Sequence, residues 1–374
     1  MSSQDVIIVG GGIIGGSIAF ELARRGVRAT ILDRQEPGRE ASWAAAGMLS
    51  PSPESPASIA LVPLARASLA LFPQFVSLIE EVSGRKAGYR AEGALEVFLR
   101  GDAERELSTL IAMNRGLGIE CEPLRLEEAR EMEPAMSEEA RAAALFPNEA
   151  AVDNRALTAA VLTAAAVEGA EIRGGAAVKS LLREKDRCIG VETQSGEKLF
   201  AGQVVLAAGC WSSLLDGAAS LGAPTRPVRG QMVALHHKGK PIRCVMRSER
   251  VYIVPRNDTR PQKLVLGSTL EDAGYEKRVT PGGLEKILSA VNELSPGLAH
   301  AEIIETWSGL RPGSPDQLPI LGPASIEGLV MATGHYRNGI LLSPITSKLV
   351  ADWITEKTIP AEWEKFSPQR FARD

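Results

Sequence analysis

A chain of 374 residues is long enough for roughly two domains of about 150 residues each. Its hydrophobic content of 44% and charged content of 24% are ordinary for a folded globular protein with a sizeable core. A net charge of −4 argues against nucleic acid or an anionic membrane surface as a general partner.

The sequence indicates neither a metal site nor an export signal. Its four cysteines are scattered without metal-ligand spacing, which favours idle thiols in a reducing compartment. A strand is expected from Asp5, which leaves no room for a signal peptide, and no apolar run reaches the roughly 18 residues of a membrane span. We therefore expect a cytoplasmic protein.

The first feature along the chain is a nucleotide-binding turn. Val6–Val9 is a short apolar strand, followed directly by G-x-G-x-x-G at Gly10, Gly12 and Gly15, and then by a helix that ends near Gly26. The first glycine permits a tight turn, the second lets backbone approach a pyrophosphate, and the third allows the helix to pack closely on the strand. The start of the helix offers free N–H groups to phosphates.

An acidic residue follows the turn at the expected separation. Asp33 ends the next predicted strand, 18 residues after Gly15, where an acid commonly binds a ribose. A carboxylate at this place would repel the 2′-phosphate of NADP, whereas NAD and FAD both fit. Glycines on a purely structural turn are the alternative interpretation.

Three further segments suggest one discontinuous domain around a long cofactor. The small residues Ala44–Gly47 imply something packed closely against backbone, although a tightly packed helix start explains them equally well. Strands are predicted at Glu171–Val178 and Gln203–Ser212, with a helix before the first and a hairpin between the two. The last segment is a strand at Gly328–Thr333 that leads into an apolar helix from Gly339.

Two insertions between these segments are expected to form an antiparallel sheet with helices on one side. The predicted strands include Gly93–Leu99, Gly230–His237 and Lys263–Thr269. Pro51–Ala60 is rich in proline and serine and is expected to be a loop.

Together these segments resemble the D-amino-acid oxidase-like FAD oxidoreductases, and most closely the glycine oxidases of thiamine biosynthesis. The resemblance covers almost the whole chain in the family's order. Besides the glycine turn with Asp33, it is carried by AAAGML (Ala44–Leu49), VVLAAGCWS (Val204–Ser212), RPVRGQM (Arg226–Met232), YIVPR (Tyr252–Arg256), GLRPGSPDQLPILGP (Gly309–Pro323), GHYRNGILLSP (Gly334–Pro344) and FSPQRF (Phe366–Phe371).

The resemblance implies an α/β fold in which a FAD-binding, Rossmann-like domain of the glutathione-reductase type carries an α+β substrate domain built on an antiparallel sheet. The FAD-binding domain would be discontinuous, at 1–85, 146–222 and 303–374. The substrate-binding domain would take 86–145 and 223–302. The resemblance also implies a homo-oligomer, a tetramer.

The family's FAD contacts transfer to matching positions of this sequence. The glycine turn would meet the pyrophosphate, Asp33 and Arg34 the adenosine ribose, and Val178, at the end of its predicted strand, the adenine. The full set is Gly10, Gly12, Ile13, Ile14, Gly15, Asp33, Arg34, Ala41, Ser42, Ala46, Gly47, Met48, Val178, Gly209, His335, Tyr336, Arg337, Asn338, Gly339, Ile340 and Leu341. FAD is expected to bind non-covalently, because no cysteine follows Cys244 to tether it as in monomeric sarcosine oxidases.

The resemblance places three catalytic residues around the substrate. Arg311 would clamp the substrate carboxylate, for which a planar guanidinium is suited, although spacing alone favours a surface arginine. Tyr252 would donate to the same carboxylate, and Arg337 would contact the substrate at the flavin edge. Met48 and Leu270 would complete the substrate pocket, with Leu270 standing where relatives carry methionine.

The chemistry implied is oxidative deamination of glycine and small amines or D-amino acids. Hydride would pass from Cα to flavin N5, dioxygen would reoxidise the flavin to give hydrogen peroxide, and the imine would hydrolyse in water or supply the thiamine thiazole. No protein base is required, so His335 is expected to act through its backbone.

Several alternatives stay open on the sequence. They are a quinone-linked D-amino-acid dehydrogenase or a sarcosine or D-amino-acid oxidase of the same fold, a non-enzymatic FAD-binding protein, and an NAD dehydrogenase. The coexistence of Arg311, Tyr252 and Arg337 argues against mere binding, since a FAD carrier needs no carboxylate clamp.

Overall fold

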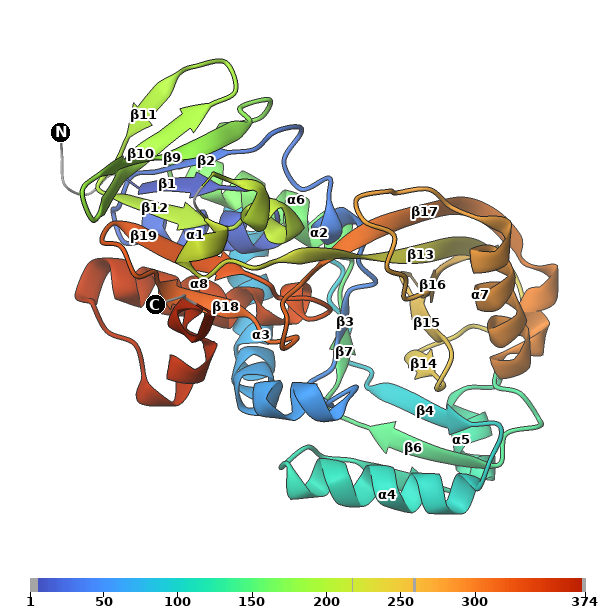
Figure 1. Cartoon of the computed structure of the whole chain (residues 1–374). Helices are drawn as coiled ribbons and strands as arrows, with labels where there is room; N and C mark the ends of the chain where they lie inside the picture. The colour runs from blue at the N-terminus through green and yellow to red at the C-terminus, as the bar shows by residue number, and fades with distance from the viewer. Residues whose placement is uncertain (1–5, 217, 258–259, 372–374) are drawn as a thin grey trace.

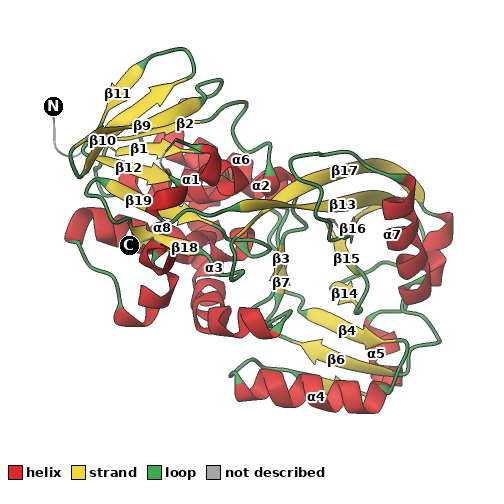
Figure 2. Cartoon of the chain, in the orientation of Figure 1, coloured by secondary structure: helices red, strands yellow, loops and turns green. Residues whose placement is uncertain are grey.

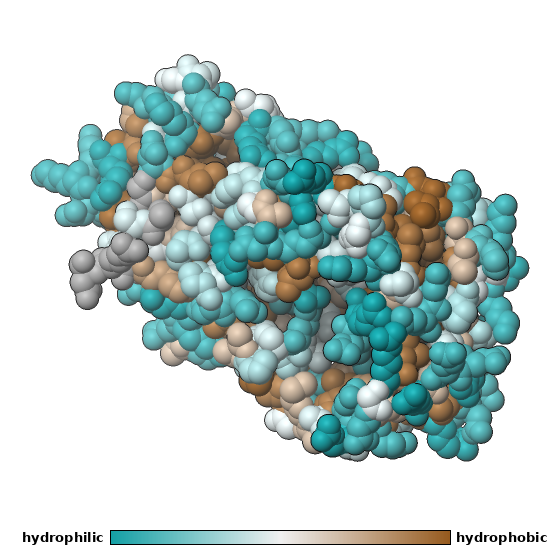
Figure 3. Space-filling model, turned by 45° about the vertical axis from the view of Figure 1, so that its right-hand side comes forward, coloured by the Kyte–Doolittle hydropathy of each residue, from teal (hydrophilic) through white to brown (hydrophobic). Residues whose placement is uncertain are grey.

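The computed structural model describes residues 6–216, 218–257 and 260–371, which are arranged around two large sheets (Figure 1). Figure 2 shows helices gathered below the first sheet and around the outer end of the second. The face turned forward in Figure 3 is mostly hydrophilic, with apolar side chains in small groups.

The first sheet is the predicted nucleotide-binding sheet. Its strands are parallel except for the edge strand β18, and β1 lies centrally between β12 and β2. In spatial order the strands are β18 (Ile320–Pro323), β19 (Leu329–Thr333), β12 (Gln203–Leu206), β1 (Val6–Val9), β2 (Ala29–Leu32) and β8 (Glu171–Arg173).

Both faces of this sheet are covered, which explains why its strands are continuously apolar. On one face Val6 and Ile8 pack with four helices: α1 (Ile13–Arg24), α3 (Val62–Ser83), α6 (Asn154–Val167) and α8 (Gly339–Glu356). On the other face Ile7 and Val9 pack under an antiparallel meander of β9 (Val178–Glu184), β10 (Arg187–Thr193) and β11 (Lys198–Phe200).

The second sheet has eight strands and begins with two strands of 12 residues that run antiparallel. In spatial order the strands are β17 (Glu302–Gly313), β13 (Arg226–His237), β16 (Gln262–Gly267), β15 (Tyr252–Pro255), β14 (Val245–Arg247), β4 (Ala94–Phe98), β6 (Ala142–Phe146) and β5 (Glu122–Leu124). The pairing is antiparallel except between β14 and β4, which are parallel.

Helices cover both faces of the second sheet, whereas the sequence predicted helices on one side. α7 (Pro281–Leu294) and α5 (Leu126–Met132) pack on one apolar face, and α4 (Ala103–Gly116) contributes to the other. The prediction was wrong because β4 and β6 are apolar on both faces: Leu95 and Ala143 belong to the first cluster, Ala94 and Ala144 to the second.

Shorter elements join the two sheets. α2 (Ala41–Ala44) and the two-stranded ladder of β3 (Met48–Leu49) with β7 (Ala150–Ala151) lie between them (Figure 1). The remaining elements are 3₁₀ helices: η1 (Pro56–Leu61), η2 (Gly209–Leu214), η3 (Ala219–Leu221), η4 (Pro296–His300), η5 (Ala361–Phe366) and η6 (Pro368–Phe371).

Three predicted segments need correction. The strand expected at Glu171–Val178 breaks after Arg173, because Gly175 adopts φ +74° and turns the chain, so that Val178 begins the next strand. The strand expected at Gln203–Ser212 ends at Leu206 and gives way to η2. The expected loop at Pro51–Ala60 contains η1, which Ser55 and Ser58 start with a capping box.

The stretch Pro56–Ser83, which joins η1 to α3, is long and apolar enough by itself to cross a membrane, although the sequence predicted no span. A single helix of this kind does not establish a membrane span, because the core helix of a folded domain passes the same test of length and composition. Here Leu64, Phe72 and Ile79 are fully buried against the helical side of the first sheet.

The proposed division into domains at 1–85, 146–222 and 303–374 against 86–145 and 223–302 stays a prediction. Most strands fall on the expected side of these boundaries. β17 is the exception, because residues 303–313 pair with β13 in the second sheet.

Candidate functional site

A long cavity lies between the two sheets, and most of the predicted site residues line it. Its walls come from the turn after β1, from α2 and β3, from the turn after β12, from β13, β15 and β17, and from the segment before α8. Three predicted residues are not among those that line it: Gly15, Leu270 and Leu341.

The glycine turn can fit a phosphate group. Gly10 has φ +109°, and a Cβ there would lie 2.4 Å from the carbonyl oxygen of Ala207. A Cβ on Gly15 would lie 1.9 Å from the carbonyl oxygen of Gly10, so Gly15 serves by letting α1 approach the turn, not by facing the cavity. α1 begins at Ile13, whose N–H donates to Ser42 Oγ at 2.9 Å. The turn is therefore bare backbone at the positive end of a helix.

Asp33 is held at the end of β2 by backbone N–H groups. Its Oδ2 accepts from Gly11 N at 2.8 Å and its Oδ1 from Gln35 N at 3.0 Å. These bonds fix a carboxylate on the cavity wall beside the glycine turn, where a ribose would need acceptors.

Arg34 is anchored by residues that sequence reasoning missed. Its guanidinium stacks on the Trp211 ring at 3.8 Å and pairs with Glu40, which also accepts from Lys277 Nζ at 2.9 Å. Tyr275 lies beside Trp211 and donates to the carbonyl oxygen of Cys210 at 2.9 Å. The connection between β16 and α7 thus reaches across to this end of the cavity, which no local pattern could reveal.

The small residues Ala44–Gly47 pack against backbone and against a buried guanidinium. Gly47 has φ +74°, and a Cβ there would lie 2.0 Å from the carbonyl oxygen of Val152. Arg256 donates to the carbonyl oxygens of Ala46 and Val152, both at 2.7 Å. Burial lowers the pKa of Arg256 to about 10. Arg256 was given no role from the sequence, although an arginine at the end of an apolar strand could have indicated a buried guanidinium.

Trp43, which directly precedes these small residues, packs away from the cavity. It packs edge-on against Trp307, with ring centroids 5.9 Å apart, and Arg155 lies 3.6 Å from its ring centroid. Arg155 in turn forms an ion pair with Glu305 at 2.9 Å. Trp43 is also not among the residues that line the cavity.

Arg311, Tyr252, Met48 and Arg337 line the same cavity. Arg311 donates to Ser268 Oγ at 2.6 Å, to the carbonyl oxygen of Thr269 at 3.2 Å and to that of Arg229 at 3.3 Å. No ion pair joins Arg311 to a carboxylate within the described part of the chain. Burial lowers the pKa of its guanidinium.

Glycines make room for these side chains. A Cβ on Gly230 would lie 2.3 Å from Arg311 Nη1, and one on Gly267 would lie 2.7 Å from the Tyr252 hydroxyl. The Tyr252 hydroxyl lies 3.4 Å from Met232 Sδ, a weak acceptor, and stays available to a stronger one. These glycines were quoted as parts of motifs but were not assigned a role from the sequence.

Arg337 pairs with Glu54, which sequence reasoning also missed. Glu54 lies in the segment before η1 and lines the cavity. The cavity thus holds the guanidinium groups of Arg311 and Arg337 and the carboxylate of Glu54, an arrangement that favours a small anionic group.

Leu270 does not reach the cavity. Its side chain is 61% exposed, because residues 268–270 form a bulge between two places where this segment pairs with β13. Within the bulge Thr269 turns inward, where its hydroxyl accepts from Gln231 N at 2.9 Å, and Leu270 turns to the solvent. Assigning Leu270 to the substrate pocket was therefore wrong.

The segment before α8 approaches the cavity through backbone. Gly334 has φ +70° and Tyr336 φ +49°, and α8 begins at Gly339. His335 is 3% exposed, its Nε2 lies 3.1 Å from Thr346 Oγ1, and burial lowers its pKa to about 3. The imidazole is therefore neutral at ordinary pH. Leu341 faces the core between the helices instead of the cavity.

Comparisons with known proteins agree with this arrangement. The family model DAO, described as FAD dependent oxidoreductase, matches residues 5–353. The glycine oxidase of Geobacillus kaustophilus is 36% identical, over 98% of this chain and 97% of its own. The bifunctional protein ThiO/ThiG of Trichormus variabilis is 36% identical over 99% of this chain, which spans only 56% of that relative's length.

Solved structures give the same result. The crystal structure of glycine oxidase from Geobacillus kaustophilus superposes with a TM-score of 0.90 at 35% identity and covers 98% of each chain. That of glycine oxidase from Bacillus cereus gives 0.88 at 35% identity, over 95% of this chain and 96% of its own.

Gly15→Ala tests the glycine turn. Its Cβ would collide with backbone, so we expect the free energy of unfolding to fall by about 1–3 kcal/mol. The yellow colour of the purified protein should fall with it, read as the flavin-to-protein absorbance ratio. Gly116→Ala is the control, since its Cβ would meet nothing within 4 Å, and it should be neutral or stabilising. Full flavin content in Gly15→Ala would contradict this role.

His335 should make the fold acid-sensitive. The unfolded chain takes up a proton near the ordinary pKa of about 6.5, whereas the folded chain resists protonation until about 3. Stability is therefore fully present above pH 6.5 and is lost progressively as the pH falls towards 3. Chemical denaturation at pH 7.5 and pH 5 should show a smaller loss in His335→Gln than in the parent. The exposed His300→Gln should behave like the parent, and equal losses in all three would contradict the assignment.

Proposed function

Because the chain belongs to the DAO family of FAD-dependent oxidoreductases, we propose that it oxidises glycine and other small amines with dioxygen. Glycine, dioxygen and water would give glyoxylate, ammonia and hydrogen peroxide. The observation that carries the proposal is Arg311, a buried guanidinium held by neutral oxygen atoms, with Tyr252 and Arg337 lining the same cavity. The relatives do not favour the alternatives raised from the sequence.

FAD is the cofactor of this family, and the cavity walls fit it. The fit is supported by the bare backbone at Gly10 and Gly47, which a Cβ would fill, and by the carboxylate of Asp33. The residues proposed to hold it are the predicted ones that line the cavity, without Leu341 and with Gly15 acting through the turn. Bound FAD would accept a hydride from the substrate and pass the electrons to dioxygen. Non-covalent attachment stays part of the proposal.

The residues around the substrate would act by positioning. Arg311 can offer two parallel charge-assisted bonds to a carboxylate, and the Tyr252 hydroxyl can add a third. Arg337 would join them once its ion pair with Glu54 opens. His335 is neutral and hydrogen-bonded away in the core, so we propose no proton transfer through it. Catalysis would then rest on holding the substrate in a reactive orientation.

The pathway and the assembly are also proposals. Relatives named bifunctional ThiO/ThiG support a role in thiamine biosynthesis, in which the imine of glycine supplies the thiazole. A cytoplasmic location remains an expectation from the sequence, and a tetramer remains an expectation of the family resemblance.

A substrate panel tests the proposed function. We expect hydrogen peroxide from glycine and sarcosine, lower rates from D-alanine and D-proline, and poor rates from D-phenylalanine, because Met48 and Tyr252 limit the room. A pocket distinguishes one methylene by only about 1–3 kcal/mol, so kcat/KM should be graded. L-amino acids should fail, since the same clamp would aim their side chain where the hydrogen must leave.

The panel also has outcomes that would overturn the proposal. D-Phenylalanine exceeding glycine tenfold in kcat/KM would remove glycine as the substrate but leave an amine oxidase. Flavin reduction by glycine without peroxide formation in air would remove dioxygen as the acceptor.

Arg311→Ala tests the clamp. Loss of a buried charge partner costs roughly 2–5 kcal/mol, so kcat/KM for glycine should fall about 30-fold to several thousand-fold. Arg311→Lys should recover only part, because an ammonium cannot make the bidentate contact. The control is Arg250→Ala, which removes an exposed ion pair with Glu293 and should leave kcat/KM unchanged. If Arg311→Ala still binds flavin and its kcat/KM for glycine is within threefold of the parent value, Arg311 does not bind the substrate carboxylate.

A further inference from the structure

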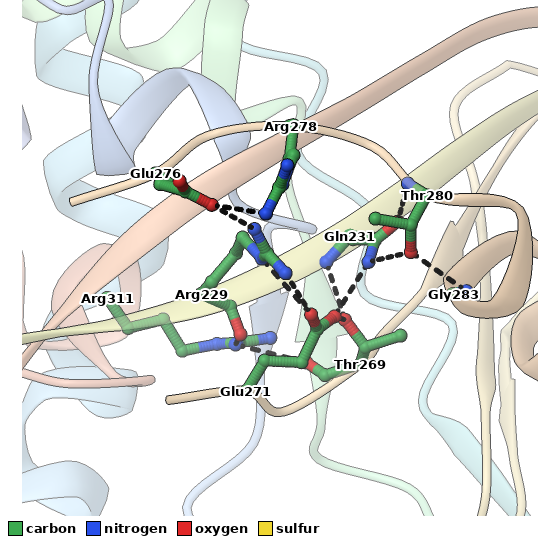
Figure 4. Close-up of polar contacts among 9 residues, drawn as sticks. All are labelled: Arg229, Gln231, Thr269, Glu271, Glu276, Arg278, Thr280, Gly283 and Arg311. Carbon is green, nitrogen blue, oxygen red and sulfur yellow. Dashed lines mark hydrogen bonds and ion pairs between the residues drawn. The ribbon is translucent and has the colours of Figure 1, made fainter. Parts of the chain in front are cut away.

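Arg311 takes its orientation from a short stretch of chain behind it. Two of its three acceptors lie in the bulge at residues 268–270, and the third is the carbonyl oxygen of Arg229 on β13. None of the three is itself charged, so what sets their positions decides where the guanidinium points. Figure 4 shows the polar contacts that surround them.

The bulge arises because the segment opposite β13 has one residue more than β13 between two paired positions. β13 pairs with this segment at Met232↔Gly267 and again at Arg229↔Glu271. Between these two places β13 has two residues and the opposite segment has three. Such a bulge loses regular backbone pairing and needs other bonds to keep its shape.

Glu271 supplies those bonds. Its Oε2 accepts from Arg229 Nε at 3.1 Å and Nη2 at 2.5 Å. Its Oε1 accepts from Gln231 Nε2 at 2.8 Å and from the hydroxyl of Thr269, whose oxygen replaces a backbone acceptor for Gln231 N. Four donors therefore meet at one carboxylate, and each belongs to the bulge or to β13.

This carboxylate lies on the side of β13 away from the cavity. Gly230 and Met232 line the cavity, and Arg229 and Gln231 alternate with them along the strand. Gln231 also accepts from Thr280 N at 2.8 Å, and Thr280 caps α7 through Gly283 N at 3.2 Å. The arrangement is thus anchored at the start of α7, and Figure 4 shows Gln231, Thr280 and Gly283 joined in this way.

The negative charge of Glu271 also balances the positive charge of Arg229. The side chain of Arg229 is only 8% exposed, and Glu271 is the acid hydrogen-bonded to it, whereas Glu276 forms a longer ion pair with it at 3.9 Å. Burial works to raise the pKa of Glu271, but the hydrogen bonds from Thr269, Arg229 and Gln231 prevail and hold it below its usual value. Glu271 is therefore ionised, and removing its charge leaves the buried guanidinium of Arg229 with only the longer ion pair to Glu276.

We propose that Glu271 is a positioning residue for substrate binding, acting through the bulge at residues 268–270 on the guanidinium of Arg311. The inference rests on the proposed function, because it assumes that Arg311 binds the substrate carboxylate. Substrate affinity then depends on a carboxylate that never touches the substrate.

The test uses the FAD-loaded enzyme with acetate as the simplest carboxylate, whose binding is followed by the change in flavin absorbance. In Glu271→Gln, acetate should bind about tenfold more weakly, or about 1.4 kcal/mol, and KM for glycine should rise by a similar factor with kcat within about twofold. A merely structural role would lower flavin content and kcat instead. Glu276→Gln is the matched control, since Glu276 is 57% exposed, and it should resemble the parent.

Thr269 gives a second pair of variants should Glu271→Gln fail to fold. Thr269→Val loses the hydroxyl that joins Gln231 to Glu271, so acetate should bind more weakly. Thr269→Ser keeps the hydroxyl and should bind acetate like the parent. Equal acetate binding in Thr269→Val and the parent would overturn the proposal.

Arg311→Ala in the same assay separates this inference from the proposed function. If it abolishes acetate binding while Glu271→Gln and Thr269→Val bind normally, only the positioning role is wrong. If Arg311→Ala also binds acetate normally, the proposed clamp is wrong as well.

Discussion

The site depends on a buried positive charge that neutral oxygen atoms hold in place. A guanidinium taken out of water is costly unless it is paired or fully hydrogen-bonded. Arg311 meets part of that cost with two carbonyl oxygens and a hydroxyl, which accept from its two Nη nitrogens without cancelling its charge. Its attraction for an anion therefore remains.

Other buried arginines of the protein show the contrast. Arg247 lies between Glu96 and Glu149, both at 2.5 Å, so its charge is cancelled within the fold. Arg256, like Arg311, donates to carbonyl oxygens, but those belong to Ala46 and Val152 and fix the backbone beside the cavity. The acceptors around each arginine thus decide its role. Arg247 forms internal ion pairs, Arg256 supports backbone, and Arg311 is a candidate for binding an anion.

Close backbone approach is the second requirement of this site. At Gly10, Gly47 and Gly230 a Cβ would stand 2.0–2.4 Å from an atom across the cavity wall or from the guanidinium itself. These glycines lie in different strands and connections, and at each of them the missing side chain avoids a steric clash. Bare backbone at these positions therefore lets neighbouring atoms approach the cavity wall closely. Chemistry by positioning needs such fixed walls more than it needs a titrating base.

The sequence by itself determined the elements whose signals are local. The strand, glycine turn and helix at residues 6–24, the acid at Asp33 and the strand before α8 follow from periodicity and from the conformational demands of glycine. The resemblance then pointed to Arg311, Tyr252 and Arg337, which the fold brings to one cavity.

Only the tertiary structure decided the contacts between segments distant in the chain. The bulge that turns Leu270 outward needs β13 as its partner, and Arg256 reaches residues more than one hundred positions away. Lys277 crosses to Glu40 from the connection between β16 and α7. A sequence pattern reports which side chains share a strand or helix face. It does not report register between strands, and register decides which oxygen atoms a buried guanidinium meets.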